Sequence, residues 1–355
     1  MADDDAAHRA PAGSPLPGTR EPPASRYDVA LLDLDGVVYL GGHPIAGAAE
    51  ALEKAAAGGM RLAFVTNNAS RTPSAIAAQL TGLGVRATVQ DVVTSAQAAA
   101  RLLAEKLPPG APVLVVGGIG LRVAVRERGF RPVSVASEHP AAVAQGYAPG
   151  LSYDLLAEGA LAVAVGAWYV ASNADSTLPT PRGRQPGNGS LIQVIATATG
   201  RYPVVAGKPE PPLHAEAVAR SGARNPLVVG DRLDTDIESA VRSGADSLLV
   251  FTGVTRPLDV VLAPAGRRPT YLAGGLAGLL VPHPPVTATG DGFGCGGWRA
   301  RRGDHGGIVM SGSGAGMDGL RALCAAAWTG PGLSAEQAAA AVAALGLPRS
   351  AGVPG

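Results

Sequence analysis

The sequence has few cysteines, few aromatic residues and almost no lysine. Two cysteines in 355 residues, Cys295 and Cys324, are too few for a disulfide framework, and neither lies in a CxxC pair. No apolar run approaches the roughly 18 residues that a membrane span needs. The polar, proline-rich N-terminus also lacks the apolar segment of a secretory signal. We therefore expect a cytoplasmic protein in a reducing compartment.

Excess charge of either sign is also absent. The net charge of +1 offers no electrostatic attraction to nucleic acid or to an anionic membrane, so we expect neither as a partner. The 46% hydrophobic and 16% charged residues are typical of a globular protein, and the length favours about two domains. The three lysines (Lys54, Lys106 and Lys208) stand against 26 arginines, which suggests a GC-rich genome. A lysine at a strand end is therefore informative here.

Short apolar runs alternate with alanine-rich helical patterns, which indicates βαβ units and a parallel sheet. The predicted fold class is α/β, with a doubly wound parallel-sheet core. The segment from about residue 285 is rich in glycine and has no clear period before two helical stretches. We expect it to be a small appended α/β or partly helical module.

Polar side chains follow four apolar runs of this pattern. In an open parallel sheet, the carboxyl ends of the strands form the ligand crevice. Clustered acids repel one another unless a cation lies among them, and an all-oxygen site suits Mg²⁺, which commonly serves phosphate substrates. The groups concerned are Asp33 and Asp35; Thr66, Asn67 and Asn68; Lys208; and Asp231, Asp234 and Asp236.

The spacing of Asp33 and Asp35 adds to this argument. Residues i and i+2 of a strand face the same side, so both carboxylates can address one ligand. One can attack phosphorus and form an aspartyl-phosphate, while the other protonates the leaving oxygen and later takes a proton from water. Gly36, directly after them, lets the backbone turn sharply.

Four segments in the correct order carry a family resemblance: "DLDGVVYLGG", "FVTNNASRTP", "GKPEP" and "VVGDRLDTDI". They resemble the motifs of the haloacid dehalogenase (HAD) superfamily, and more narrowly of its NagD-like, p-nitrophenylphosphatase-like subfamily IIA. The resemblance covers roughly residues 27 to 280. It implies a Mg²⁺-dependent phosphatase that hydrolyses a small phosphorylated metabolite, with a Rossmann-like core.

The resemblance also implies a role for each matching residue. Asp33 is the expected nucleophile and Asp35 the general acid/base, with Lys208 pairing with the nucleophile and the phosphate. The expected metal ligands are the Asp33 side chain, the Asp35 carbonyl and the Asp231 side chain, with Asp236 as support. Thr66, Asn67 and Asn68 are the expected phosphate-binding residues.

The 140 residues between Asn67 and Lys208 exceed what one βα unit needs, and in the subfamily an α/β cap is inserted there. The stretch "ASNADSTLPTPRGRQPGNGS" resembles the end of that cap, with Ser172 in place of the usual threonine, and it makes Asn173 and Asp175 candidates at the core–cap junction. The expected division is a disordered lead (1–25), a catalytic core (26–99 and 196–284), the cap (100–195) and a C-terminal extension (285–355).

The length, the lead and the glycine-rich tail resemble those of actinobacterial glycerol 3-phosphate phosphatases, whose tail is likened to a partial acetyltransferase fold. Glycerol 3-phosphate is therefore the substrate we expect first. Nucleoside monophosphates, pyridoxal phosphate and 2-phosphoglycolate stay open as alternatives, because the core motifs are common to the family. The oligomeric state is also open, a homodimer included.

Other hypotheses compete for the same residues. A phosphomutase or a dehalogenase would keep the fold, although a dehalogenase needs no acid such as Asp35. A receiver-like phospho-switch also gathers acids, a threonine and a lysine at strand ends, but it lacks so long an insert. Asp234 could be only a helix cap, and the glycine-rich "VVGGIGLRV" and "SGSGAGMDG" are expected to be turns or loops. His43, His139, His214, His283 and His305 lack metal-ligand spacing, and we expect them on the surface or in loops.

Overall fold

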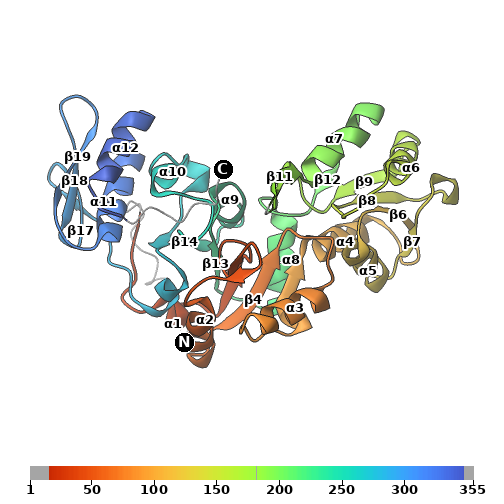
Figure 1. The fold of residues 1–355 in the computed structure, drawn as a ribbon, viewed down its shortest axis with the longest axis horizontal. Helices are drawn as coiled ribbons and strands as arrows, with labels where there is room; N and C mark the ends of the chain where they lie inside the picture. Colours follow the sequence, from red (N-terminus) through yellow and green to blue (C-terminus); the bar gives the residue numbers. More distant parts are fainter. Residues whose placement is uncertain (1–15, 181, 348–355) are drawn as a thin grey trace, which may run out of the picture.

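Six parallel strands form the central sheet, in the order β15-β14-β13-β1-β4-β5 (Figure 1). The computed structural model describes residues 16–180 and 182–347. The sequence order reverses on either side of β1, as in other doubly wound sheets, and this places the crevice at the carboxyl ends of β1 and its neighbours. The strands are β1 (Val29–Leu32), β4 (Arg61–Thr66), β5 (Val92–Thr94), β13 (Pro226–Gly230), β14 (Asp246–Val250) and β15 (Tyr271–Ala273).

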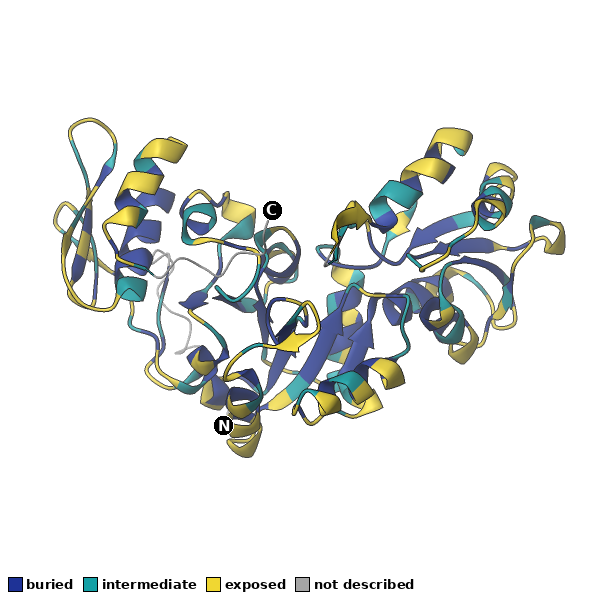
Figure 2. Cartoon of the chain, in the orientation of Figure 1, coloured by how far each residue is buried: buried dark blue, intermediate teal, exposed yellow. Residues whose placement is uncertain are grey.

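Both faces of this sheet are buried, because successive side chains of a strand point to opposite sides. Ala30 and Leu32 pack with α1 (Pro23–Arg26), α2 (Ala48–Ala57) and α3 (Pro73–Gly82). Val29 and Leu31 pack on the other face with α4 (Ser95–Lys106), α8 (Pro211–Ser221) and α9 (Glu238–Arg242). The strands are buried over most of their length while the outer helix faces are exposed (Figure 2). The doubly wound parallel sheet that we predicted is confirmed.

A second parallel sheet, inserted between β5 and α8, has the order β12-β9-β8-β6-β7. Helices α4 and α5 (Ile119–Glu127) pack on one face, and α6 (Tyr153–Ala164) and α7 (Asn188–Thr199) pack on the other. We refer to this sheet and its helices as the cap (Figure 1). Its strands are β6 (Pro112–Val116), β7 (Arg131–Val133), β8 (Ala142–Gln145), β9 (Trp168–Ala171) and β12 (Val204–Val205).

The expected cap boundaries fall inside helices. The boundary after residue 99 lies within α4, which packs against both α5 of the cap and α8 of the core. The boundary after residue 195 lies within α7, and β12 of the cap sheet follows that helix. We therefore propose that the cap runs from about the end of α4 to the end of β12. The glycine- and proline-rich stretch before α7 contains a hairpin of β10 (Thr177–Thr180) and β11 (Gly183–Pro186).

The expectation of a disordered lead is wrong for residues 16–25, and residues 1–15 lie outside the described part of the chain. Leu16 is buried, and its carbonyl accepts from the backbone N–H of Val286 at 3.1 Å. The backbone N–H of Thr19 donates to the carbonyl of His283 at 2.7 Å. The polar, proline-rich composition of this segment gave no sign of ordered structure. Its hydrogen-bond partners, His283 and Val286, lie far away in the sequence, so no local pattern could indicate the contact.

The C-terminal extension forms a four-stranded antiparallel sheet with two helices. The sheet follows the order β16-β17-β18-β19. Its apolar residues share one cluster with Leu249 and Leu272 of the central sheet, and the indole N–H of Trp328 donates to the carbonyl of Val260 at 3.1 Å. The extension is therefore packed as part of the core. Its elements are β16 (Thr287–Thr289), β17 (Gly292–Cys295), β18 (Trp298–Arg302), β19 (Ile308–Gly312), α11 (Gly316–Trp328) and α12 (Ala335–Ala343).

Buried polar groups link the extension to the core. The guanidinium of Arg321 donates to Asp318 at 2.6 Å and lies 3.2 Å from Nδ1 of His283, whose Nε2 lies 2.8 Å from the carbonyl of Gly278. His283 lies in a loop, as one of the two expected positions had it, but it is only 2% exposed and so is buried there. Among the described helices, none is long and apolar enough to cross a membrane.

Candidate active site

Asp33 and Lys208 meet at the carboxyl edge of the central sheet. Asp33 follows β1 directly, and its Oδ1 accepts from Lys208 Nζ at 2.5 Å. The same ammonium donates to Oδ1 of Asp236 at 2.8 Å. Burial would lower the pKa of Lys208, but the two carboxylates outweigh that effect and hold the pKa above its ordinary value. The lysine therefore carries its charge throughout the physiological range.

Asp236 reaches this ion pair through a wide π-helical turn, Leu233–Ile237, which follows β13. Such turns are frequent at functional sites, because the extra residue redirects a side chain. Asp236 uses both of its oxygens: Oδ1 binds Lys208, and Oδ2 accepts from the backbone N–H of Arg232 at 3.1 Å. Its carboxylate is thus engaged by protein groups, as a supporting residue requires.

Asp231, at the end of β13, has a different environment. Its Oδ2 accepts from the backbone N–H of Val254 at 2.6 Å, whereas its buried Oδ1 has no hydrogen-bond partner among the described residues. A Cβ on Gly253 would lie 2.0 Å from Oδ2, and one on Gly36, where φ is +82°, would lie 2.4 Å from it. Only glycine allows the two loops to approach this carboxylate so closely.

The donor set fits a small divalent cation. Oxygens of Asp33, Asp231 and Asp236 lie within 4.8 Å of one another. Burial raises the pKa of Asp33 and of Asp231, and the neighbouring carboxylates add to the rise, so the ionised cluster is costly without a counter-charge. An unpaired buried carboxylate oxygen among all-oxygen donors is what Mg²⁺ prefers. Asp33 and Asp231 would hold the ion, with the carbonyl of Asp35 close in the chain.

Asp35, two residues after Asp33, is exposed. Although the side chain is exposed, the protein around it removes enough water to raise the pKa to about 6, and the nearby guanidinium of Arg71 opposes that rise. A carboxyl with a raised pKa can hold a proton near neutral pH and deliver it to a leaving group. The two acids of the first motif therefore have different environments.

Thr66, Asn67 and Asn68 follow the neighbouring strand. The register pairs Leu32 with Phe64, so Thr66 ends β4 beside the nucleophile position. The Asn68 backbone N–H donates to Thr66 Oγ1 at 3.1 Å, and Asn68 Oδ1 accepts from the backbone N–H of Ser70 at 2.9 Å. The Asn68 side-chain oxygen thus shapes its own loop, and the phosphate-binding role expected of Asn68 stays a prediction.

Asn67 and the two junction residues are brought together. Asn67 Nδ2 donates to Asp175 Oδ2 at 3.1 Å, and Asn173 Nδ2 donates to the carbonyl of Asn67 at 2.8 Å. Burial raises the pKa of Asp175, and the hydrogen bond from Asn67 opposes the rise. The geometry therefore gives the Asn67 side chain partners within the protein, and the phosphate-binding role expected of Asn67 stays a prediction.

Two arginines of the crevice were not identified as functional residues from the sequence. Arg71 acts electrostatically on Asp35, and Arg232 forms a bidentate pair with Asp234 at 2.9 and 3.0 Å. Both lie inside the quoted motifs, "FVTNNASRTP" and "VVGDRLDTDI", yet arginine is so common in this chain that composition offered no signal. The arginine pair accounts for Asp234, whose side chain caps no helix in the structure.

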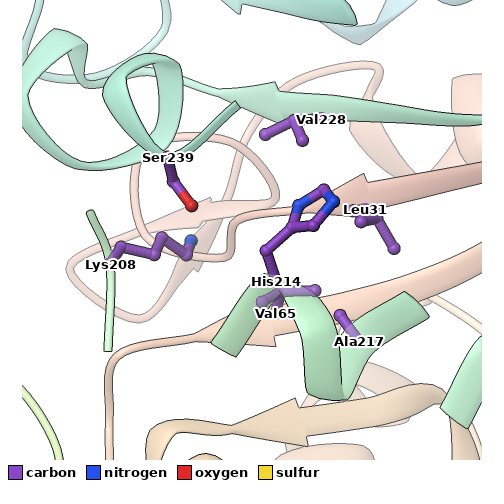
Figure 3. Close-up of a pocket in the computed structure, with 7 residues that line it drawn as sticks. All are labelled: Leu31, Val65, Lys208, His214, Ala217, Val228 and Ser239. Carbon is purple, nitrogen blue, oxygen red and sulfur yellow. The ribbon is translucent and has the colours of Figure 1, made fainter. Parts of the chain in front are cut away.

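A cavity of about 20 Å³ lies behind Lys208, with room for about one water molecule. Lys208, Ser239 and the ring of His214 direct their polar atoms toward one another around it (Figure 3). His214 lies on α8 and is partly buried, and burial lowers its pKa. The expected surface or loop position of His214 is therefore wrong.

Fold and site together define a Rossmann-like α/β hydrolase with a carboxylate metal centre under a cap. The haloacid dehalogenase-like hydrolase model matches residues 30–131, and an HAD-hydrolase-like model matches residues 205–279. A GCN5-related N-acetyltransferase-like model matches residues 295–347, within the extension. The chain belongs to the haloacid dehalogenase-like hydrolases, as the sequence motifs predicted.

Several relatives are phosphatases or nucleotidases. The chain is 51% identical to D-glycerol 3-phosphate phosphatase of Mycobacterium tuberculosis over 256 residues, and this aligned region covers 72% of each chain. It is 38% identical to a 5'-nucleotidase of Bacillus subtilis, over 65% of this chain and 89% of the other. The crystal structure of a glycerol phosphate phosphatase from M. tuberculosis with magnesium superimposes with a TM-score of 0.82 at 43% identity, covering 92% of this chain and 99% of that one. The structure of a p-nitrophenyl phosphatase from Archaeoglobus fulgidus superimposes with a TM-score of 0.66 at 28% identity, covering 72% of this chain and 98% of that one.

Proposed function

We propose that the protein hydrolyses glycerol 3-phosphate through an aspartyl-phosphate on Asp33. The chain is a phosphomonoester hydrolase that uses Mg²⁺. The observation that carries the substrate is the similarity to a glycerol phosphate phosphatase over 92% of this chain, a span that includes both the cap and the extension. The structures of p-nitrophenyl phosphatases cover only about 70% of this chain.

In the proposed reaction, Asp33 attacks the phosphorus atom in line with the leaving oxygen. The phosphorus–oxygen bond to glycerol breaks, and Asp35 gives its proton to the departing alkoxide. Asp35 then removes a proton from water, which attacks the aspartyl-phosphate, releases inorganic phosphate and restores Asp33. Mg²⁺ bound at Asp33 and Asp231 supplies positive charge to the phosphoryl oxygens.

Lys208 and Thr66 complete this proposal. The Lys208 ammonium already touches Asp33, so it lies where negative charge gathers on the transferred group. Thr66 offers a hydroxyl at the neighbouring strand end. Asp236 holds the ammonium from the other side. The residues of the protein therefore supply a nucleophile, a proton donor, a fixed positive charge and a metal-binding site.

A nucleoside monophosphate is a second candidate substrate, since a 5'-nucleotidase is 38% identical to this chain. Substrate choice depends on what the cap places above the leaving group, and the family motifs do not include those side chains. The cytoplasmic location, the absence of nucleic acid as a partner and a homodimer stay predictions.

A panel of phosphomonoesters assayed with Mg²⁺ tests the proposed substrate. We expect the highest kcat/KM with glycerol 3-phosphate, compared with nucleoside monophosphates, pyridoxal phosphate and 2-phosphoglycolate. A higher kcat/KM for any other member would contradict the proposed substrate and leave the phosphatase class intact. Formation of a phosphorylated isomer in place of free phosphate would indicate a mutase.

A further inference from the structure

Lys208 reaches the active site directly from the cap. The adjacent strands β9 and β12 end side by side, with Val205 paired to Ala171 and the backbone N–H of Ala206 donating to the carbonyl of Ala171 at 2.9 Å. Lys208 lies three residues beyond β12, while its ammonium lies against Asp33 and Asp236 of the core. Any displacement of these cap strands would therefore reach the lysine unless its backbone is held.

The side chain of Asn67, in the core, holds the backbone of Lys208 through two hydrogen bonds. Its Oδ1 accepts from the backbone N–H of Lys208 at 2.8 Å, and its Nδ2 donates to the carbonyl of Lys208 at 3.2 Å. One side-chain amide thus brackets one residue of the backbone from both sides. The other Nδ2 hydrogen serves Asp175 at 3.1 Å, so both amide hydrogens are used within the protein.

The backbone around this bracket is packed tightly. A Cβ on Gly207 would lie 2.6 Å from Asn67 Oδ1 and 3.0 Å from the Asn173 Cβ. The carbonyl of Asn67 accepts from Asn173 Nδ2 at 2.8 Å and from Ser95 Oγ at 2.6 Å. Asn67 therefore contacts the segment directly after β9 and the segment directly after β12.

We propose that Asn67 is a positioning residue that fixes Lys208 and the segments directly after β9 and β12 to the core, and that its side chain does not bind the phosphoryl group. A phosphoryl oxygen only accepts hydrogen bonds, and Asn67 has no side-chain hydrogen left to donate. Its effect on catalysis passes through the ammonium of Lys208. This inference rests on the phosphate-binding role proposed above for Lys208.

A double-mutant cycle tests the route of this effect. The Kd of inorganic phosphate with Mg²⁺, from calorimetry, and kcat with p-nitrophenyl phosphate are measured for Asn67→Ala, Lys208→Met and the double variant. We expect Asn67→Ala to weaken phosphate binding and lower kcat by about 10- to 100-fold, the usual effect of losing a residue that orients a functional group. In the Lys208→Met background, Asn67→Ala should change Kd and kcat by less than about a further 3-fold, because the effects of residues that act through one another are not additive.

A conservative exchange provides a second readout. Asn67→Asp keeps the acceptor for Lys208 N–H but sets two carboxylates against each other, so it should lose activity. Adding Asp175→Asn restores a donor between the two residues and should recover at least about 3-fold in kcat over Asn67→Asp alone. Asn225→Ala, at the opposite edge of the same sheet, is the matched control and should leave Kd and kcat unchanged.

Each result separates the alternatives. Multiplicative losses in the double variant would mean that Asn67 contacts phosphate independently, which overturns the inference. Unchanged phosphate affinity in Asn67→Ala would overturn it as well. Unchanged affinity in Lys208→Met would instead contradict the role proposed for the lysine, and with it the inference, while phosphate release by the unmodified protein tests the phosphatase class separately.

Discussion

Lys208 and Asp236 form a buried ion pair, with Nζ 2.8 Å from Oδ1. The lysine arrives from the end of the cap sheet and the aspartate from a π-helical turn after β13. The partner of Asp236 is also the partner of Asp33, so one ammonium serves the candidate nucleophile and its support. Because both charges are buried, removal of either one would leave the other without a counter-charge in surroundings that exclude water.

Replacing the nucleophile should abolish turnover and spare the fold. We expect Asp33→Asn to lower kcat by at least about 10³-fold, since no other group can form the acyl-phosphate. The melting temperature without metal should be unchanged or higher, because burial and the neighbouring carboxylate of Asp236 oppose ionisation of Asp33. Steady-state phosphate release and thermal unfolding measure the two effects.

Asp28→Asn is the matched control for that experiment. Asp28 precedes β1 as Asp33 follows it, and its carboxylate accepts from the backbone N–H groups of Arg224 and Asn225. This variant should lose stability and keep its kcat. Turnover at the unmodified rate by folded Asp33→Asn would rule out the assigned nucleophile.

Asp231 should govern metal affinity. The buried Oδ1 without a partner among described residues is a ready ligand atom, so Asp231→Asn should raise the Mg²⁺ concentration for half-maximal activity about 10- to 100-fold. Activity titrations and calorimetry with Mg²⁺ provide the measurement. Asp234→Asn serves as control, because its carboxylate pairs with Arg232 instead. Equal Mg²⁺ requirements in the two variants would contradict this metal site.

Gly253 should tolerate no side chain. A methyl group there would lie 2.0 Å from Asp231 Oδ2, so Gly253→Ala must displace that carboxylate. We expect kcat/KM to fall about 10²-fold, the scale of an error of roughly 1 Å in a catalytic group. Gly274→Ala, where an added Cβ meets nothing within 4 Å, should keep normal kinetics. Normal activity of Gly253→Ala would mean that the carboxylate is not held in this position.

His283 should make a destabilising contribution on mild acidification. Burial lowers the pKa of His283 below its ordinary value, and the Arg321 guanidinium beside Nδ1 lowers it further, whereas the carbonyl of Gly278 at Nε2 opposes the change. As pH falls below about 6.5, the unfolded chain takes up a proton that the folded chain refuses. The free energy of unfolding should then decrease by up to about 1.4 kcal/mol per pH unit, until the folded-state pKa is reached.

Urea unfolding at pH 7.5 and pH 5.5 measures this dependence. His283→Gln should reduce the difference between the two pH values. The slope that remains should combine His214, whose pKa burial lowers, with Asp33 and Asp231, whose raised pKa values favour the folded state as pH falls. A slope unaltered by His283→Gln would show that this histidine does not set the acid sensitivity.

The extension should be needed for folding. Trp328 is only 8% exposed and its indole binds the carbonyl of Val260, so Trp328→Ala should cost about 3–5 kcal/mol of unfolding free energy. Truncation after residue 284 should yield insoluble protein, since Leu249 and Leu272 of the core lose their cover. Val309→Ala, at a residue 44% exposed, is the control within the extension. A soluble, fully active truncated protein would show that the extension is dispensable.

Local patterns predicted much of the core. The apolar run before Asp33 and the one before Asp231 each predicted a strand whose end carries chemistry, because a strand buried on both faces reads as continuous hydrophobic residues. Strands β7 and β8 of the cap were missed, and for the extension only a small α/β or partly helical module was predicted, without the positions of its strands. Short strands such as Arg131–Val133 have exposed arginines and neighbouring prolines in place of a clear period.

The sequence by itself determined the parallel α/β core, the family and the acids, threonine and lysine that end its strands, since these depend on local patterns and short motifs. Only the tertiary structure decided that Asn67 brackets Lys208, that Asp231 keeps an oxygen free, and that His283 is buried beside Arg321. Each of these facts joins segments far apart in the chain. Contacts of that kind arise from packing, and no local pattern encodes them.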